Sequence, residues 1–483
     1  MKKRHGLTMI ISITIIALVV LSWIIPAGQW SGTELMSLGR SRIGLYELFD
    51  YPLLAIQYFI QLIIFILAVG GLYGVLSKTD AYKNFIEKIA KALKGKEVIF
   101  LVVIAFVMAV LTSVCSLGIL LFLFIPAIIA IVTFLGYDKI TAMLVTFGAT
   151  LIGTIGSTYN YFVTGYINQA LSTDFTTEII TKIALFVITF VIYIAFTIKH
   201  ASKSKKANDK SDEIMFIEGS SSKKTKIWPI VLVFSVVAVL MILACTPWKL
   251  VFKLEFFETL HTTITTFTLG KDFAIFGSLI GKMPAFGNWY YQQIAAVVIV
   301  LTIIFSLVYK IKFSEVADNF FEGIKKMIKP ALIITLSMTI VVITAYNPFY
   351  TTVASWFMNA SEWIVNLLGN VKWLSFLGTF VNTFFTSIVS IISSALNIEM
   401  VYVSQSQLAL LLGTLGSTAT NMIAVATQAL YGLTMFVAPT STMLILGLEF
   451  LGINYKEWIK KTWKLLVTLL VVIFIIILIV AYI

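Results

Sequence analysis

The chain has 483 residues, of which 59% are hydrophobic and only 12% are charged. Many apolar runs approach the roughly 20 residues that a helix needs to cross a bilayer, so the composition is that of a polytopic membrane protein rather than a soluble one. The net charge of +12 is explained better by basic loops on one side of a membrane than by nucleic-acid binding.

The first predicted crossing, residues 7–25, lies in a unit of residues 1–54 that also carries an outer loop. Its apolar run is long for a signal peptide and further spans follow, so we interpret it as a membrane helix. A second crossing, residues 55–76, opens the first of two predicted repeats, residues 55–199. An amphipathic helix that we expect at the cytoplasmic interface follows this crossing.

The next stretch holds two interrupted apolar regions, a predicted hairpin at residues 98–136 and a predicted broken helix at residues 140–170. The first apolar run of the hairpin has only about 14 residues, or roughly 21 Å of helix, which is too short to cross a bilayer. The broken helix is interrupted by the small and polar segment Gly153–Asn160. Hydrocarbon tolerates such backbone only where protein or a water-filled cavity covers it, and transporters bind their cargo at sites of this kind.

A Ser/Lys-rich segment, residues 200–227, is predicted to be a flexible cytoplasmic linker. Scaffold helices and loops follow in residues 228–330, and residues 331–483 form the second predicted repeat. This repeat has its own hairpin at about residues 375–412 and its own broken helix at about residues 422–452, which is interrupted at residues 434–441.

The spacings agree between the two repeats. The predicted hairpin begins 43 residues after the start of the crossing in the first repeat (55 to 98) and 44 residues after it in the second (331 to 375). The parity of nine crossings and two hairpins places 27 of the 35 Lys and Arg residues in the cytoplasm, together with the N-terminus. The predicted fold is therefore an all-α polytopic membrane protein with inverted repeats, about nine transmembrane helices, two re-entrant hairpins and two broken helices.

Several motifs resemble those of the YfcC-type carriers, which are grouped with the anaerobic carriers of four-carbon dicarboxylates in the ion transporter superfamily. These motifs are Ile24–Gly28, Leu135–Asp138, Phe313–Ala317 with Phe321–Gly323, and Pro439–Ser441 with Leu446–Gly447 and Tyr455–Trp458. The resemblance covers nearly the whole chain and implies inverted repeats with two hairpins and two broken helices, often in dimers.

The chain also departs from the pattern of these carriers at three places. The acidic pair that the family carries after the first hairpin tip is replaced by Leu120–Phe124. The Pro-Ser-Gly-Ser-Gly of the second hairpin is Ser390–Ser394, and the Gly-Asp-Gly before the last break is Leu430–Gly432, without the acid. These departures concern the substrate rather than the fold.

A carrier site at this depth needs exposed backbone dipoles and small side chains, because half-helix N-termini attract a carboxylate and C-terminal carbonyls hold a cation. The candidate substrate- and ion-binding residues are Ser113, Ser116, Gly118, Gly156, Ser157, Thr158, Asn160, Ser390, Ser393, Ser394, Asn397, Glu399, Gln428, Thr434, Pro439, Thr440 and Ser441. The small residues also suit close helix packing, and the amides of Asn160 and Gln428 also suit structural bonds between helices. Glu399 is either a functional acid within the membrane or a solvated group at the outer mouth of the second hairpin.

The sequence therefore predicts a secondary active transporter of a small carboxylate-bearing solute, an amino acid or a dicarboxylate, across the cytoplasmic membrane. Transport is expected to be coupled to Na⁺ or H⁺ or to proceed by exchange, with the hairpin tips as the candidate sodium site and with no catalytic residues, cofactor or resident metal. The alternatives are a basic amino acid antiporter of the same fold and, less favoured, an ion channel, which would show a continuous polar pore lining. A homodimer is the expected assembly.

Overall fold

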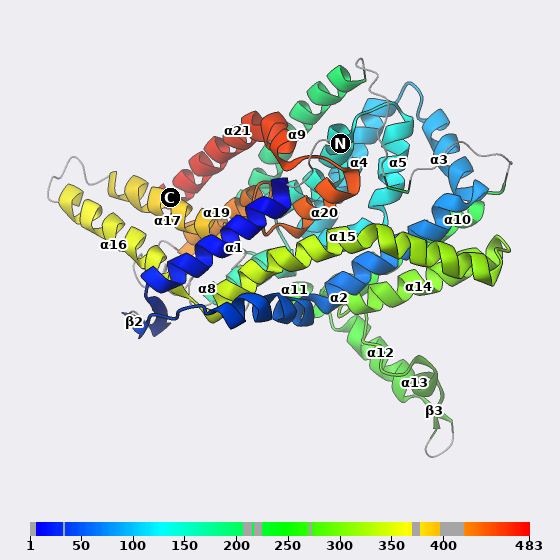
Figure 1. Ribbon diagram of the computed structural model, residues 1–483, viewed down its shortest axis with the longest axis horizontal. Helices are drawn as coiled ribbons and strands as arrows, with labels where there is room; N and C mark the ends of the chain where they lie inside the picture. Colours follow the sequence, from blue (N-terminus) through cyan, green and yellow to red (C-terminus); the bar gives the residue numbers. More distant parts are fainter. Residues whose placement is uncertain are drawn as a thin grey trace.

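Two long antiparallel helices, α2 (Leu45–Lys78) and α15 (Phe313–Tyr346), form the central pair of the computed structural model (Figure 1). The structure describes residues 6–31, 34–205, 215–216, 225–269, 273–369, 377–396 and 420–483. A Cβ on Gly74 of α2 would lie only 2.7 Å from the Cα of Gly323 in α15, so glycine is needed where these two backbones meet.

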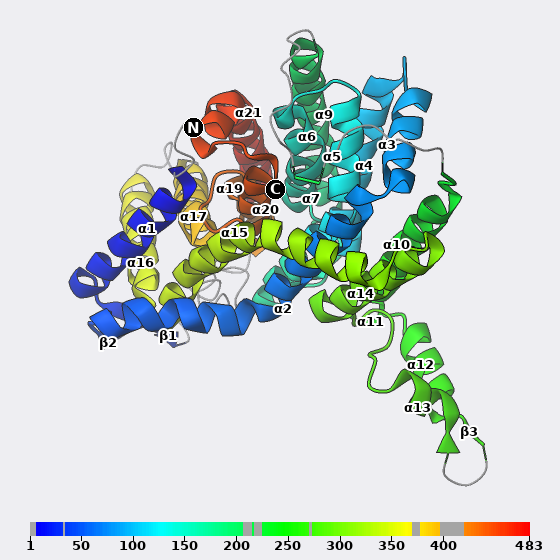
Figure 2. The same ribbon diagram turned by 45° about the vertical axis from the view of Figure 1, so that its right-hand side comes forward.

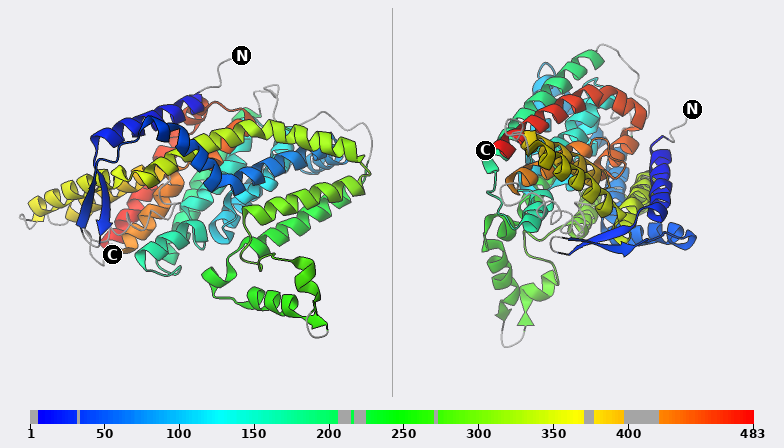
Figure 3. Two further views of the ribbon diagram at one scale, coloured as in Figure 1. Left: turned by 60° about the horizontal axis from the view of Figure 1, so that its bottom comes forward. Right: turned by 90° about the vertical axis from the view of Figure 1, so that its left-hand side faces the viewer.

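Two further helices pack on the central pair: α1 (Gly6–Ile24) contacts α15, and α14 (Tyr291–Val308) contacts α2. Helix α10 (Trp228–Cys245) in turn contacts α14. A two-stranded antiparallel ribbon, β1 (Ala27–Ser31) with β2 (Glu34–Gly39), follows α1. The segment between α10 and α14 forms an arm that projects from the rest of the molecule (Figure 3). Its elements are α11 (Trp248–Phe252), α12 (Phe256–Thr266), β3 (Thr268–Leu269), β4 (Phe273–Ala274) and α13 (Ile275–Ile280).

The helices of the two predicted repeats gather in two neighbouring groups on one side of the central pair (Figure 2). The first group contains α3 (Asp80–Ala92), α4 (Glu97–Cys115), the 3₁₀ turn η1 (Gly118–Leu123), α5 (Ile125–Phe134), α6 (Lys139–Met143), the π-helical η2 (Leu144–Gly148), α7 (Ala149–Ile155), η3 (Tyr161–Gly165), α8 (Tyr166–Leu171) and α9 (Ile179–Ser204). The second group contains α16 (Phe349–Gly369), α17 (Leu377–Ala395), α19 (Thr420–Thr434), α20 (Thr442–Leu451) and α21 (Tyr455–Tyr482).

Within the described part of the chain, nine helices are long and apolar enough to cross a membrane: α1, α2, α4, α9, α10, α14, α15, α17 and α21. The all-α polytopic membrane fold is thus confirmed. The set of nine helices differs from the predicted set of crossings. It includes α4 and α17, which are the first arms of the predicted hairpins. It lacks the two predicted broken helices, which are divided into shorter pieces.

The predicted length of the first hairpin arm was wrong. Helix α4 has 19 residues and continues through Thr112 to Cys115, because the Thr112 hydroxyl bonds back to the Met108 carbonyl at 2.9 Å instead of interrupting the helix. The chain nevertheless returns to the end where α4 begins. Lys205 lies 3.0 Å from Glu97 at the start of the hairpin, and its ammonium lies 5.3 Å from the ring centroid of Tyr137 at the end of it.

Two predicted crossings begin earlier than expected. Helix α15 begins at Phe313, within the region predicted as scaffold helices and loops, and α2 begins at Leu45, within the predicted outer loop. The predicted linker is not wholly solvated. Its residue Phe216 is only 3% exposed and packs between the rings of Tyr73 and Phe450, with centroid distances of 6.2 and 6.0 Å.

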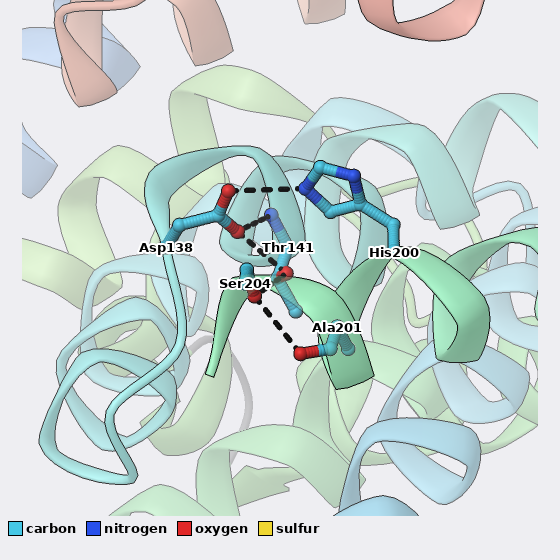
Figure 4. A network of polar contacts seen from close by, with 5 residues as sticks. All are labelled: Asp138, Thr141, His200, Ala201 and Ser204. Carbon is cyan, nitrogen blue, oxygen red and sulfur yellow. Dashed lines mark hydrogen bonds and ion pairs between the residues drawn. The ribbon is translucent and has the colours of Figure 1, made fainter. Parts of the chain in front are cut away.

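The broken helix of the first group begins at a capped turn (Figure 4). Asp138 accepts hydrogen bonds from the Thr141 amide at 2.9 Å and the Thr141 hydroxyl at 2.6 Å, and its other carboxylate oxygen lies 3.0 Å from the His200 ring. The Thr141 hydroxyl also lies 3.3 Å from that of Ser204. Burial raises the pKa of Asp138, but the hydrogen bonds from His200 and Thr141 outweigh it and lower that pKa below its ordinary value. This network joins the start of α6 to the last turns of α9.

Candidate functional site

The tip of the first hairpin is held in a strained conformation. Helix α4 ends at Ser116, whose φ of 61° is left-handed, a region that costs a non-glycine residue roughly 1–2 kcal/mol. The Ser116 hydroxyl oxygen accepts a hydrogen bond of 2.8 Å from the backbone N–H of Tyr161, just after the first helix break. This contact fixes the tip against the break and explains why the strain persists.

The first helix break, residues 156–160, lies directly against the hairpin arm. The backbone N–H of Thr158 donates to the Ser113 carbonyl at 3.1 Å, and the Ser113 hydroxyl donates to the Gly156 carbonyl at 2.7 Å. The Asn160 side-chain amide donates to the Thr112 carbonyl at 2.9 Å. These bonds satisfy backbone groups that the interrupted helix leaves unpaired, which is the condition for a break inside a membrane.

Asn160 also starts the second half of the broken helix. Its side-chain oxygen accepts from the backbone N–H groups of Phe162 and Val163 at 2.9 and 3.2 Å, which is an N-cap arrangement. Since its amide nitrogen is already bonded to the hairpin arm, this side chain holds three elements together. The structure thus shows it making an interhelical bond, and its role toward a solute stays a prediction.

The second group repeats this arrangement at the break between α19 and α20. The Thr440 hydroxyl donates to the Ala395 carbonyl at the end of α17, at 2.8 Å. This bond joins residues 45 apart in the sequence, the same separation as between Ser113 and Thr158. Ser441 then caps α20 by accepting from the Leu444 N–H at 3.3 Å. The equal separation is what two diverged copies of one arrangement would leave.

The two breaks are connected through α19. The Thr164 hydroxyl donates to the side-chain oxygen of Gln428 at 3.0 Å, and the Gln428 amide lies 3.4 Å from the Ile155 carbonyl at the end of α7. Gly432 is needed one turn further along α19, because a Cβ there would lie 2.7 Å from the Ile155 Cα. Helix α19 therefore packs against the first break at backbone distance.

A cavity of about 420 Å³ lies beside these junctions. Its walls come from the first hairpin tip, the first break, α8, α2, the start of α14, α19 and the start of α20. Four of the predicted site residues line it: Ser116, Gly118, Asn160 and Ser441. The volume falls in the range of about 300–1,000 Å³ typical of small-molecule sites.

The other predicted residues lie behind this lining or elsewhere. Five are buried in the hydrogen-bonded junctions just described: Ser113, Gly156, Ser157, Thr158 and Gln428. Thr434 ends α19, and Pro439 and Thr440 lie in the second break, where the Pro439 carbonyl accepts a bond of 2.6 Å from Ser337 of α15. Ser390, Ser393 and Ser394 are buried in α17. Asn397 and Glu399 lie outside the described residues.

Sequence reasoning missed the aromatic part of the cavity. The tyrosines that line it are Tyr58, Tyr166, Tyr290, Tyr291 and Tyr431. Tyrosines near helix ends ordinarily belong to a belt at the membrane–water interface. No signal in the sequence distinguished the cavity tyrosines from tyrosines of such a belt.

Sequence reasoning also missed Lys182, because the predicted crossing began one residue later. In the described part of the chain, Lys182 is the only charged side chain that is buried, and its ammonium has no hydrogen-bond partner. An ionisable residue at such a position in a membrane helix is a functional candidate by default. The described residues contain no cluster of three or more His, Cys, Asp or Glu side chains that could hold a metal ion.

Comparison with known proteins finds a family model and relatives that match most of the chain. The profile of the DcuC family, described as C4-dicarboxylate anaerobic carrier, matches residues 5–482. An uncharacterised protein of Haemophilus influenzae is 22% identical over 86% of this chain and 74% of its own length. The putative basic amino acid antiporter YfcC of Escherichia coli is 23% identical over 83% of this chain and 73% of its own length.

Two solved structures are similar over nearly the whole chain. The YdaH transporter of Alcanivorax borkumensis is 12% identical, with a TM-score of 0.42, and the match covers 97% of this chain and 98% of that one. MtrF of Neisseria gonorrhoeae, described among antimetabolite efflux pumps, is 12% identical, with a TM-score of 0.38, and the match covers 98% of this chain and 94% of that one.

Proposed function

Because the chain belongs to the family of C4-dicarboxylate anaerobic carriers, we propose that it is a secondary active transporter of a small carboxylate-bearing solute, an amino acid or a dicarboxylate. That it is a membrane transporter and not an enzyme follows from the family itself. The solute and the coupling are our proposal. The observation that supports a small solute is the cavity of about 420 Å³ bounded by residues of both predicted repeats.

Two features of the lining suit a carboxylate. Ser441, Thr442 and Met443, the first residues of α20 and its cap, line the cavity, so the positive end of this ten-residue helix faces it. Ser116 accepts a bond from the Tyr161 N–H, which leaves its own hydroxyl proton available to a solute.

The lining of the cavity favours a neutral solute over a basic one. No described lining residue is acidic. A basic amino acid would bring a side-chain cation that none of these residues could neutralise. Leaving a buried charge uncompensated costs several kcal/mol, whereas contacts with aromatic rings return only about 0.5–2 kcal/mol. We therefore rank basic amino acid antiport second.

We assign the basic segments to the cytoplasmic side of the membrane. Three ion pairs join residues of these segments to partners distant in sequence: Lys205 with Glu97, Lys78 with Glu322, and Lys329 with Glu449. The proposal includes the cytoplasmic membrane as location, Na⁺ or H⁺ as coupling ion or exchange as the alternative, and a homodimer as assembly.

Uptake into proteoliposomes tests the proposal. Labelled succinate, L-alanine and L-arginine are offered separately under an inward sodium gradient, under a proton gradient, and against an internal load of the same solute. We expect uptake of succinate or alanine that collapses when the driving gradient is dissipated. Uptake of arginine alone would favour the antiporter alternative, and a steady ionic current without solute uptake would favour a channel.

A further inference from the structure

Five tyrosines line the cavity, and we call this set the tyrosine wall: Tyr58, Tyr166, Tyr290, Tyr291 and Tyr431. These residues come from α2, α8, the start of α14 and α19. The wall thus combines the central pair, the scaffold and both predicted repeats. No single helix supplies it, so its assembly depends on the tertiary fold.

Three rings of the wall, those of Tyr290, Tyr291 and Tyr166, are linked by ring contacts. The Tyr290 ring lies 4.0 Å from that of Tyr291 and 4.6 Å from that of Phe162, and the Tyr290 hydroxyl donates to the Tyr291 hydroxyl at 3.0 Å. Phe162 in turn lies 6.4 Å from Tyr166. Tyrosine has only two side-chain torsions, so rings that are packed in this way offer a large rigid surface at little cost in entropy.

The lining also includes hydroxyl groups from the first hairpin tip and from the start of α20. These belong to Ser116, Ser441 and Thr442. The cavity therefore combines two kinds of surface, hydroxyls with a helix N-terminus and aromatic rings.

We propose that the tyrosine wall receives the apolar, aromatic body of the solute while the carboxylate faces Ser116 and the start of α20. The substrate class is then a zwitterion or monocarboxylate with an aromatic side chain, such as an aromatic amino acid. This assignment rests on the proposed transport function and narrows it.

The ring faces disfavour the two other solute classes. A dicarboxylate would place its second charge against the negative face of the rings, which repels anions. No described lining residue carries a charge that could compensate it. An arginine or lysine side chain would be attracted by the rings but would lose its hydration without gaining a counter-ion.

The test compares ligand binding by the purified full-length protein and by two variants of Tyr290. Binding of L-phenylalanine, L-alanine, succinate and L-arginine is measured by thermal shift and by competition against labelled uptake. We expect phenylalanine to bind at least tenfold more tightly than alanine, which shares its backbone groups but lacks the ring. Tyr290→Phe should retain phenylalanine affinity within about threefold, and Tyr290→Leu should weaken it about tenfold while changing alanine affinity little.

Tyr46→Leu, at a tyrosine that is 75% exposed, is the matched control and should change nothing. Equal affinity for phenylalanine and alanine, or unchanged phenylalanine binding in Tyr290→Leu, would overturn the role of the wall and leave the transport proposal intact. Arginine binding that depends on Tyr290 would overturn the proposal by showing that the wall binds a cation. If none of the four solutes binds or is transported, the proposed function fails and takes this inference with it.

Discussion

The hydroxyl of Thr164 donates a hydrogen bond of 3.0 Å to the side-chain oxygen of Gln428, a residue 264 positions later in the chain. The Ser157 hydroxyl lies 2.8 Å from the same Thr164 hydroxyl, so a continuous chain of polar groups runs from the first helix break to α19. Both side chains are buried. The contact joins the first broken helix to α19, the helix that leads into the second break.

Replacing Gln428 by leucine should therefore impair both stability and transport. The Ile155 carbonyl would lose its partner inside the protein, which costs about 1–3 kcal/mol, and α19 would lose its register against the first break. The measurement is the melting temperature in detergent together with the initial uptake rate. Gln169→Leu, at an exposed position of α8, is the control. A Gln428→Leu variant that transports at the wild-type rate would show that this contact is dispensable.

Two substitutions at Ser116 separate the hydroxyl contact from the backbone strain. Both Ser116→Ala and Ser116→Gly remove the acceptor for the Tyr161 N–H. Glycine also relieves the left-handed φ of 61°, so the glycine variant should be the more stable of the two by about 1 kcal/mol. Equilibrium unfolding in denaturant measures the difference. If the alanine variant proves at least as stable, the tip is not strained.

Replacing Lys182 by methionine should stabilise the fold. The ammonium is buried without a hydrogen-bond partner, so an apolar side chain of similar length removes a desolvation cost, and the expected gain is about 1–3 kcal/mol. Lys182→Arg keeps the charge, and this control variant should show no gain in stability. A lower melting temperature for Lys182→Met would contradict this account. A gain in stability accompanied by a loss of uptake would indicate that the charge is retained for transport.

The Asp138 network should make stability depend on pH in the acidic range. Because the folded protein lowers the pKa of Asp138, its carboxylate stabilises the fold above the unfolded pKa of about 3.9, and this contribution is lost as pH falls toward the lowered value. Asp138→Asn keeps a good N-cap but cannot titrate. The difference in melting temperature between wild type and variant should therefore shrink as pH falls below about 4. A difference that is constant with pH would rule out this linkage.

The breaks could be predicted from the sequence because their cause is local. Clusters of Gly, Ser and Thr within apolar runs located the interruptions, and the structure has them at residues 156–160 and 435–441. The same rule failed for the end of α4, where Thr112 bonds to its own helix and the helix continues. A polar residue inside an apolar run therefore does not by itself mark a break, because its hydroxyl can bond within its own helix and sequence alone does not show which partner it takes.

The tyrosine wall and the burial of Phe216 could not be predicted, because both arise from contacts between distant segments. The tyrosines meet only when α2, α8, α14 and α19 are assembled. Phe216 is a single aromatic residue in a polar linker, and its burial depends on the rings of Tyr73 and Phe450. Such features need tertiary information, which hydrophobic periodicity does not contain.

The central claim is that the hairpin tips and helix breaks form the transport site, and uptake by variants with enlarged side chains at these points tests it most directly. Ser157 is fully buried at the first break and Ser393 is 5% exposed near the end of α17. Uptake by Ser157→Leu and Ser393→Leu is compared with that of Ser202→Leu, at an exposed position of α9, once size-exclusion profiles show that each variant is folded. The account predicts that the first two lose transport while the third retains it. Wild-type uptake by both Ser157→Leu and Ser393→Leu would contradict it.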